Sequence, residues 1–191
     1  MKKYIMNKKY RQYIGLAVAV LMYYIIHEGA HLVVALAQGV FRQINFMGLG
    51  VQIDVFAERM SSLQMGIFCL AGPLATLAVG WLMVLFVHHL CRISSSVLRA
   101  CAWYTSLIML LLDPLYLGVF YRWVGGGDMN GIALLVPAGV VSLIAGVVGD
   151  AGIHHIDGHP FGGHLCSAGG LSQADHSLGP QVIHQRGDRL H

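Results

Sequence analysis

Two histidines and a glutamate stand close together in a long apolar run, as His27-Glu28-Gly29-Ala30-His31 within residues 14–37. In an α-helix, side chains four residues apart lie on the same face, so both imidazoles can reach one metal ion. Zinc accepts nitrogen ligands readily, and a catalytic zinc site keeps one position for water. The metal acidifies that water, and a neighbouring carboxylate can then take its proton. We therefore expect His27 and His31 to bind Zn²⁺ and Glu28 to be the catalytic base.

The apolar surroundings of this motif favour a functional interpretation. Ionisable side chains are costly within a bilayer, and a group of them at membrane depth marks a site by default. The alternative is a polar cluster that hydrogen-bonds between helices without any metal. Serine, threonine and asparagine are the usual residues in that role, so the motif fits it poorly.

The composition is that of an integral membrane protein. Of the 191 residues, 56% are hydrophobic and 11% are charged, and the mean hydropathy is +0.64. At about 20 residues per span, we expect an all-α membrane protein with about four transmembrane helices, multi-pass in a bacterial-type cell membrane. The net charge is only +3, and the basic residues gather near the ends of apolar runs. This pattern reflects membrane topology and excludes a nucleic-acid partner.

The first apolar segment, residues 14–38, is expected to be a retained membrane helix. Ala35-Leu36-Ala37 resembles a signal-peptidase site, but the apolar run is too long for a signal core, and cleavage there would remove both histidines. Residues 41–57 alternate between apolar and polar or small residues around a glycine turn. This period of two predicts a β-hairpin, with an ordinary connecting loop as the alternative.

Three further apolar segments follow, at about residues 63–87, from residue 100, and at 131–149. The second segment contains Ala71-Gly72-Pro73, a small-residue patch that allows close helix packing, most usefully beside Gly29 and Ala30. We expect its proline to kink the helix. Proline also disfavours helix at the residue before it, so Asp113-Pro114 predicts that the third helix stops near Leu112.

The last part of the chain has a different composition. Residues 150–191 hold seven of the eleven histidines and eight glycines, with few apolar residues and no periodicity. We expect two regions: a membrane-embedded metalloprotease domain at residues 1–149, and a disordered His/Gly-rich tail at residues 150–191.

A catalytic zinc site usually has a third protein ligand. Glutamate is nearly excluded, because the only other one, Glu58, lies in the hairpin region, and Val34 and Ala37 stand where the extended zinc motif needs glycine and histidine. Aspartate remains. The parity of the spans puts Asp113 and Asp128 at the membrane side that the two histidines are nearer to, so either could reach them.

These residues resemble the site-2 protease (M50) family of intramembrane zinc metalloproteases. The likeness rests on the His-Glu-x-x-His motif early in a membrane helix, the Ala-Gly-Pro patch and a distant aspartate beside a membrane segment, and it covers about residues 14–149. In that family the third ligand is the Asp of an Asp-Gly motif that follows an Asn-Pro. This chain departs from the pattern, with Asp113-Pro114 and then Asp128-Met129-Asn130-Gly131. The resemblance favours Asp128 as the ligand and Asp113 in the place of the Asn.

An alternative assignment stays open for these aspartates. Asp113 would lie about as deep as the histidines if the third helix were unbroken, which would make it the ligand. It could also be a helix-breaking Asp-Pro with no chemical role.

The resemblance implies a zinc endopeptidase that cuts the transmembrane segment of another protein, often one already trimmed by a first protease. Two alternatives from other classes are a non-catalytic zinc-binding membrane protein and an ion transporter with an intramembrane His and Asp path. Lys and Arg number seven on the side of the N-terminus and three on the other, outside the tail. This asymmetry puts the N-terminus in the cytoplasm, whereas the family resemblance favours the opposite orientation.

Overall fold

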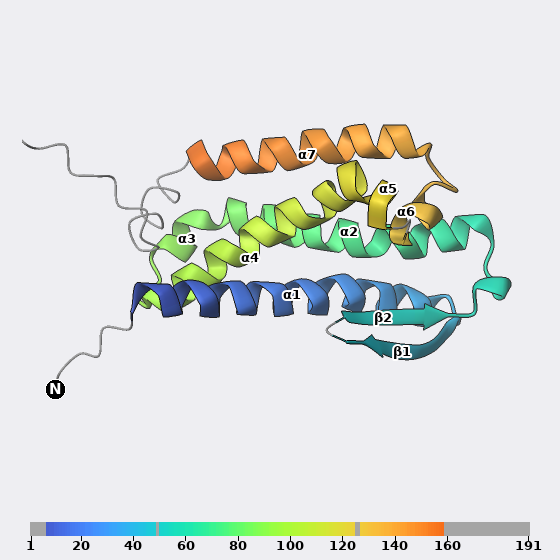
Figure 1. Ribbon diagram of the computed structural model, residues 1–191, viewed down its shortest axis with the longest axis horizontal. Coiled ribbons are helices and arrows are strands. Elements are labelled where there is room, and N and C mark those ends of the chain that lie inside the picture. The colour runs from blue at the N-terminus through green and yellow to red at the C-terminus, as the bar shows by residue number, and fades with distance from the viewer. Residues whose placement is uncertain (1–6, 49, 125–126, 159–191) are drawn as a thin grey trace, which may run out of the picture.

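The computed structural model describes residues 7–48, 50–124 and 127–158. The elements, in chain order, are α1 (Lys8–Ala37), β1 (Phe41–Met47), β2 (Gly50–Val55), the short 3-10 helix η1 (Ala57–Arg59), α2 (Ser62–Leu85), α3 (Val87–Cys91), α4 (Ser96–Leu115), the π-helical turn η2 (Tyr116–Phe120), α5 (Tyr121–Val124), α6 (Gly127–Ile132) and α7 (Ala138–Gly158). Helices α1, α2 and α4 pack against one another, and α7 packs on α4 on the side away from α1 (Figure 1).

Three helices among the described residues are long and apolar enough to cross a membrane: Lys9–Ala37, Ser62–Leu85, and Ser96–Val124. Their mean hydropathies are 1.5, 2.0 and 1.5. These helices support the expected helical membrane protein, but the four predicted spans are not confirmed. The fourth predicted segment, residues 131–149, is not one helix, because residues 133–137 form a turn that ends at Pro137. The apolar part of α7 is Ala138–Gly152, which at 1.5 Å per residue falls short of a bilayer core of about 30 Å.

Side chains at the helix N-termini accept the backbone N–H groups that have no partner within the helix. Asn7 accepts from the N–H of Lys9 at the start of α1. Ser61 and Gln64 form a reciprocal capping box at the start of α2, and Ser95 accepts from the N–H of Leu98 at the start of α4. These caps explain why the polar segments between the apolar runs give sharp helix boundaries.

The hairpin prediction is confirmed. Strands β1 and β2 pair antiparallel, from Phe41 opposite Val55 to Met47 opposite Gly50. Gly48 has a φ of 62°, a conformation that glycine adopts without a steric penalty, and it makes the tight turn possible. Strand β2 packs on α1, as Figure 1 shows, and Ile53 is buried in the core beneath it.

The third helix does not stop near Leu112, and this prediction is wrong. Helix α4 continues through Asp113-Pro114, and the chain then widens into the π-helical turn η2 before α5. Such a local widening, with help from a neighbouring side chain, can satisfy backbone groups near a proline. Here the hydroxyl of Ser142 on α7 lies within hydrogen-bond distance of two carbonyl oxygens, that of Leu117 in η2 at 3.1 Å and that of Ala138 on its own helix at 3.0 Å. Helix α4 thus continues past Asp113, which is buried in the interior.

Helix α7 also passes the predicted start of the tail at residue 150 and ends at Gly158. Residues 150–158 are therefore helical and not irregular. The rest of the predicted tail, residues 159–191, lies outside the described residues.

Candidate metal centre

The Nε2 atoms of the two histidines of the motif point toward each other. One helical turn separates them on α1, and the distance between His27 Nε2 and His31 Nε2 is 3.2 Å. Both residues are buried, with 7% and 3% of their surface exposed. Their convergence in the interior is the arrangement that the four-residue spacing predicts.

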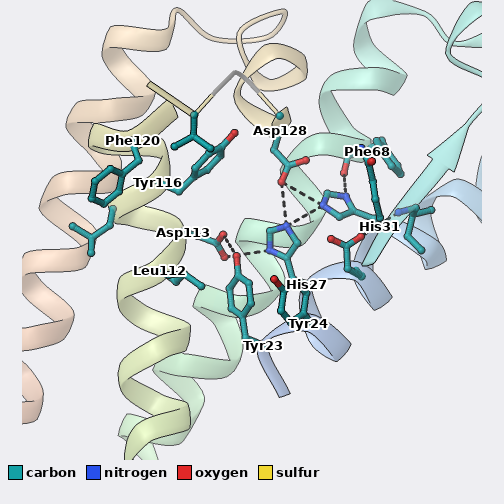
Figure 2. Close-up of a pocket in the computed structure, with 16 residues that line it drawn as sticks. Tyr23, Tyr24, His27, His31, Phe68, Leu112, Asp113, Tyr116, Phe120 and Asp128 are labelled. Atoms are coloured by element: carbon teal, nitrogen blue, oxygen red, sulfur yellow. Dashed lines mark hydrogen bonds and ion pairs between the residues drawn. The ribbon is translucent and has the colours of Figure 1, made fainter. Parts of the chain in front are cut away.

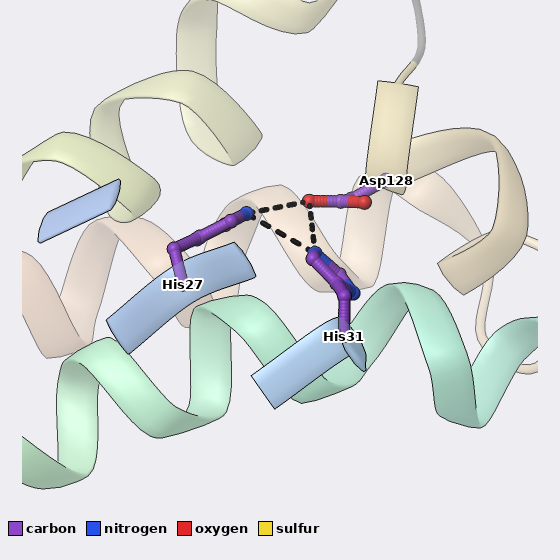
Figure 3. A group of neighbouring side chains, drawn as sticks. All are labelled: His27, His31 and Asp128. Atoms are coloured by element: carbon purple, nitrogen blue, oxygen red, sulfur yellow. Dashed lines mark hydrogen bonds and ion pairs between the residues drawn. The ribbon is translucent and has the colours of Figure 1, made fainter. Parts of the chain in front are cut away.

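Asp128, at the beginning of α6, completes the group. Its Oδ2 lies 3.1 Å from His27 Nε2 and 3.4 Å from His31 Nε2 (Figure 3). His27, His31 and Asp128 form a set that could hold a metal ion. Of the two candidate aspartates, the structure therefore brings Asp128 to the Nε2 atoms of both rings.

The hydrogen bond on the far side of His31 shows how well the donor set suits a cation. His31 Nδ1 lies 2.8 Å from the carbonyl oxygen of Phe68 on α2, and a carbonyl can only accept, so Nδ1 carries the proton. When the ring is neutral, as a metal-bound histidine must be, its Nε2 presents a lone pair toward the Asp128 carboxylate. Two acceptors facing each other repel, and a cation between them converts that repulsion into binding.

The small-residue patch on α2 makes room for the two ring nitrogens. A Cβ atom at Gly72 would lie 2.5 Å from His31 Nε2 and 2.7 Å from His27 Nε2. A side chain there would force the two rings to move, so glycine allows them their present positions. The expected partner was different: a Cβ at Gly29 would meet nothing within 4 Å, so the patch does not pack beside that glycine.

A cavity of about 500 Å³ lies beside this group (Figure 2). Its walls combine the acidic and imidazole side chains with aromatic and aliphatic ones, and they include Tyr23, Tyr24, Glu28, Gln52, Ile53, Leu112, Leu115, Tyr116, and Phe120. Glu28, the predicted base, lines this cavity, and its Oε2 accepts from the backbone N–H of Ile53 at 3.3 Å. The hairpin thus contacts the residue that would do the chemistry.

Asp113 lies on the other side of the His27 ring. Its Oδ2 is 3.4 Å from His27 Nδ1, whereas Asp128 faces Nε2. Asp113 is buried, with 1% of its surface exposed, and it accepts from the hydroxyl groups of Tyr23 and Thr76. The helix is unbroken, so Asp113 does lie as deep as the histidines, but behind one ring and not between the two.

The carboxylate of Asp128 is strongly stabilised in its ionised form. Burial raises its pKa, but the His27 and His31 rings, which donate to the carboxylate when they are protonated, outweigh that effect and lower the pKa to about 2. Asp128 is therefore an anion at neutral pH, as a metal ligand has to be.

Sequence reasoning missed Tyr23, Thr76 and the carbonyl of Phe68, and it gave Gly72 a different partner. Two of these carried a usable signal. Tyr23 precedes His27 by four residues and Thr76 follows Gly72 by four, so each lies on the same helix face as a residue of the site. A backbone acceptor such as Phe68 has no sequence signature.

Comparisons with known proteins identify no relative of this chain. No protein-family model matches it, and no curated protein and no solved structure gives a significant match.

Proposed function

We propose that this chain is an intramembrane zinc metalloprotease of the site-2 protease type. The observation that carries the proposal is the convergence of His27, His31 and Asp128 on one point among apolar helices, beside a cavity that Glu28 lines. A hydrolytic site needs a metal-binding set, a base and space for a substrate, and these three features occur together here.

The proposed metal is zinc. Two imidazole nitrogens and one carboxylate oxygen form a three-ligand set of the kind that catalytic zinc sites use, with one position left for water. When bound, zinc would acidify that water and polarise the carbonyl of the substrate. The buried ring of His31, which carries its proton on Nδ1, and the space that Gly72 leaves for the two rings fit such an ion.

Glu28 is the proposed general acid and base. It would take a proton from the attacking water and then pass it to the leaving amine. Its neighbour His27 is a proposed ligand, so the carboxylate lies next to the metal-binding set along the helix. The N–H of Ile53 restrains one of its oxygens.

The proposed substrate is the transmembrane segment of another protein, in a multi-pass enzyme of a bacterial-type cell membrane. A helix hides its carbonyl groups in internal hydrogen bonds, so the segment has to be unwound before cleavage. In an antiparallel pair, alternate backbone groups point to opposite edges. Because the Ile53 N–H points at Glu28, this edge of β2 faces the cavity and could hold an extended peptide as an added strand.

The test is a pair of glutamate variants, since the chain has only Glu28 and Glu58. The purified protein is given a fluorescence-quenched apolar peptide of about 20 residues with glycines at its centre. We expect Glu28→Gln to keep its zinc and to cut at least about 100-fold more slowly, because general-base catalysis is lost. Glu58→Gln, in η1, should cut like the wild type.

Full activity of Glu28→Gln would contradict the proposal. Zinc binding without cleavage of any apolar peptide by the wild type would instead indicate a non-catalytic zinc protein, and zinc-independent ion uptake into reconstituted vesicles would indicate a transporter.

A further inference from the structure

The buried side of His27 carries a group of side chains that the proposed chemistry does not use. Asp113 is at its centre. The hydroxyl of Tyr23 on α1 donates to Asp113 Oδ1 at 2.6 Å (Figure 2). The hydroxyl of Thr76 on α2 lies within hydrogen-bond distance of Oδ2. Three helices thus each contribute one residue to this group, and its carboxylate lies behind His27, a candidate metal ligand.

The direction of these hydrogen bonds follows from the available donors. The Thr76 hydroxyl has a single proton and three acceptors within reach: Asp113 Oδ2 and the carbonyl oxygens of Gly72 and Pro73. Asp113 Oδ2 is the nearest of the three, and the two carbonyl oxygens belong to the backbone of α2 itself, so we assign the proton to Asp113. Tyr23 and Thr76 then both donate to the carboxylate and hold its plane in place.

His27 Nδ1 is the group that this carboxylate faces. It is buried, and among the described residues it has no partner with hydrogen-bond geometry, although Asp113 Oδ2 is 3.4 Å away. The ring of Tyr23 also stacks on that of His27, with centroids 5.2 Å apart and planes 30° apart. A buried ring N–H without an acceptor is unfavourable, and Asp113 is the acceptor within reach.

We propose that Asp113, held by Tyr23 and Thr76, is the positioning residue for His27: its carboxylate accepts a hydrogen bond from the Nδ1–H group, which keeps the proton on Nδ1 and directs the lone pair of Nε2 toward His31 and Asp128. The carbonyl of Phe68 has the same function for His31. A partner behind a metal-bound histidine fixes the tautomer and the ring orientation, and it increases the basicity of the ligand. The inference rests on the proposed metal centre, and it does not depend on which bond is cut.

This role differs from that of a ligand in its consequences. Asp128 faces the Nε2 atoms of both rings, so its removal takes away a donor. Asp113 faces Nδ1, so its removal leaves every donor present but leaves one ring without its partner. The first change should abolish tight metal binding, and the second should weaken it.

Zinc affinity of the full chain, measured by competition with a chelator, separates the two roles. We expect Asp113→Ala to bind zinc about 10- to 100-fold more weakly than the wild type. Asp113→Asn keeps an acceptor oxygen and should recover most of that loss, whereas Asp128→Ala should lose tight binding altogether. The control is Ser106→Ala, which changes another buried polar side chain of α4 two turns away and should bind zinc like the wild type.

Nitrogen-15 NMR of histidine-labelled protein loaded with zinc gives a readout that a general packing defect would not produce. We expect Asp113→Ala to shift the Nδ1 resonance of His27 and to leave that of His31 unchanged, because Phe68 still holds His31. If Asp113→Ala does not fold, Tyr23→Phe tests the same point and should shift the His27 resonance alone.

Unchanged zinc affinity in Asp113→Ala would overturn the inference, and so would a loss as complete as that of Asp128→Ala, since Asp113 would then be a ligand. Equal shifts of both histidines would also overturn it. None of these measurements involves peptide cleavage, so failure of the protease assignment would show separately, in the peptide assay.

Discussion

At the scale of single residues, the candidate site depends on a residue without a side chain, Gly72, as much as on the side chains that could bind a metal. The Nε2 atoms of His27 and His31 lie where a Cβ atom of Gly72, on a different helix, would come within 2.7 Å and 2.5 Å of them. In the sequence this glycine is part of a small-residue patch that predicts close helix packing, and the structure shows that what packs closely there is the pair of imidazoles. The patch and the histidine motif are therefore parts of one site.

A pair of glycine variants tests this relation. Gly72→Ala would place a methyl group 2.5 Å and 2.7 Å from the two Nε2 atoms, so the rings would have to move. We expect its zinc affinity, measured by chelator competition, to fall at least about tenfold, because the donors lose their alignment. Gly29→Ala is the matched control, since it lies within the histidine motif but its Cβ would meet nothing within 4 Å. Equal zinc binding by the two variants would contradict this role of Gly72.

At the scale of elements, the hairpin and the proline-containing helix bring distant groups to the site. Strand β2 donates a backbone N–H to Glu28, and α4 carries Asp113 through a proline without breaking. The first contact links the β-hairpin to Glu28, the proposed base. The second depends on the π-helical turn that follows Pro114, which lets the helix go on to Val124.

The hairpin contact gives a prediction of its own. Ile53→Pro removes the N–H that Glu28 accepts but leaves the pairing with β1, because that N–H points away from β1. We expect it to keep its zinc and to cut the apolar peptide about tenfold or more slowly, since the base is less well held. Ile53→Ala also loses the buried side chain but retains the N–H, so it controls for packing and should cut faster than the proline variant. Equal rates for the two variants would show that the N–H has no part in catalysis.

At the scale of the whole molecule, the sequence predicted the parts whose signals are local. The histidine motif, the hairpin and the first two apolar helices follow from spacing, alternation and hydropathy over short windows. The third helix was expected to stop near Leu112, because the local rule for proline carries no information about the neighbouring Ser142, whose hydroxyl lies against the π-helical turn that follows. The fourth segment was placed too early, since the turn before Pro137 divides it and α7 continues to Gly158.

The choice between Asp113 and Asp128 could not be made from residues alone for the same reason. His27 and Asp128 are 101 residues apart, and which carboxylate faces Nε2 depends on the path of the chain between Leu115 and Gly127. The described part of that path contains the π-helical turn η2 and the short helix α5, and no sequence periodicity predicts either of them. Only the three-dimensional arrangement assigns the two aspartates to opposite sides of one ring.

The most direct test of the account is the metal content of the purified full chain, wild type against Asp128→Ala, with Asp54→Ala on the hairpin as the matched control. Metals are counted by mass spectrometry after dialysis, and the difference between variants removes any ions held by other histidines. We predict that Asp128→Ala holds about one zinc ion per chain fewer than the wild type, while Asp54→Ala holds the same number. Equal metal content in the wild type and Asp128→Ala would contradict the claim that α1 and α6 together form a metal centre.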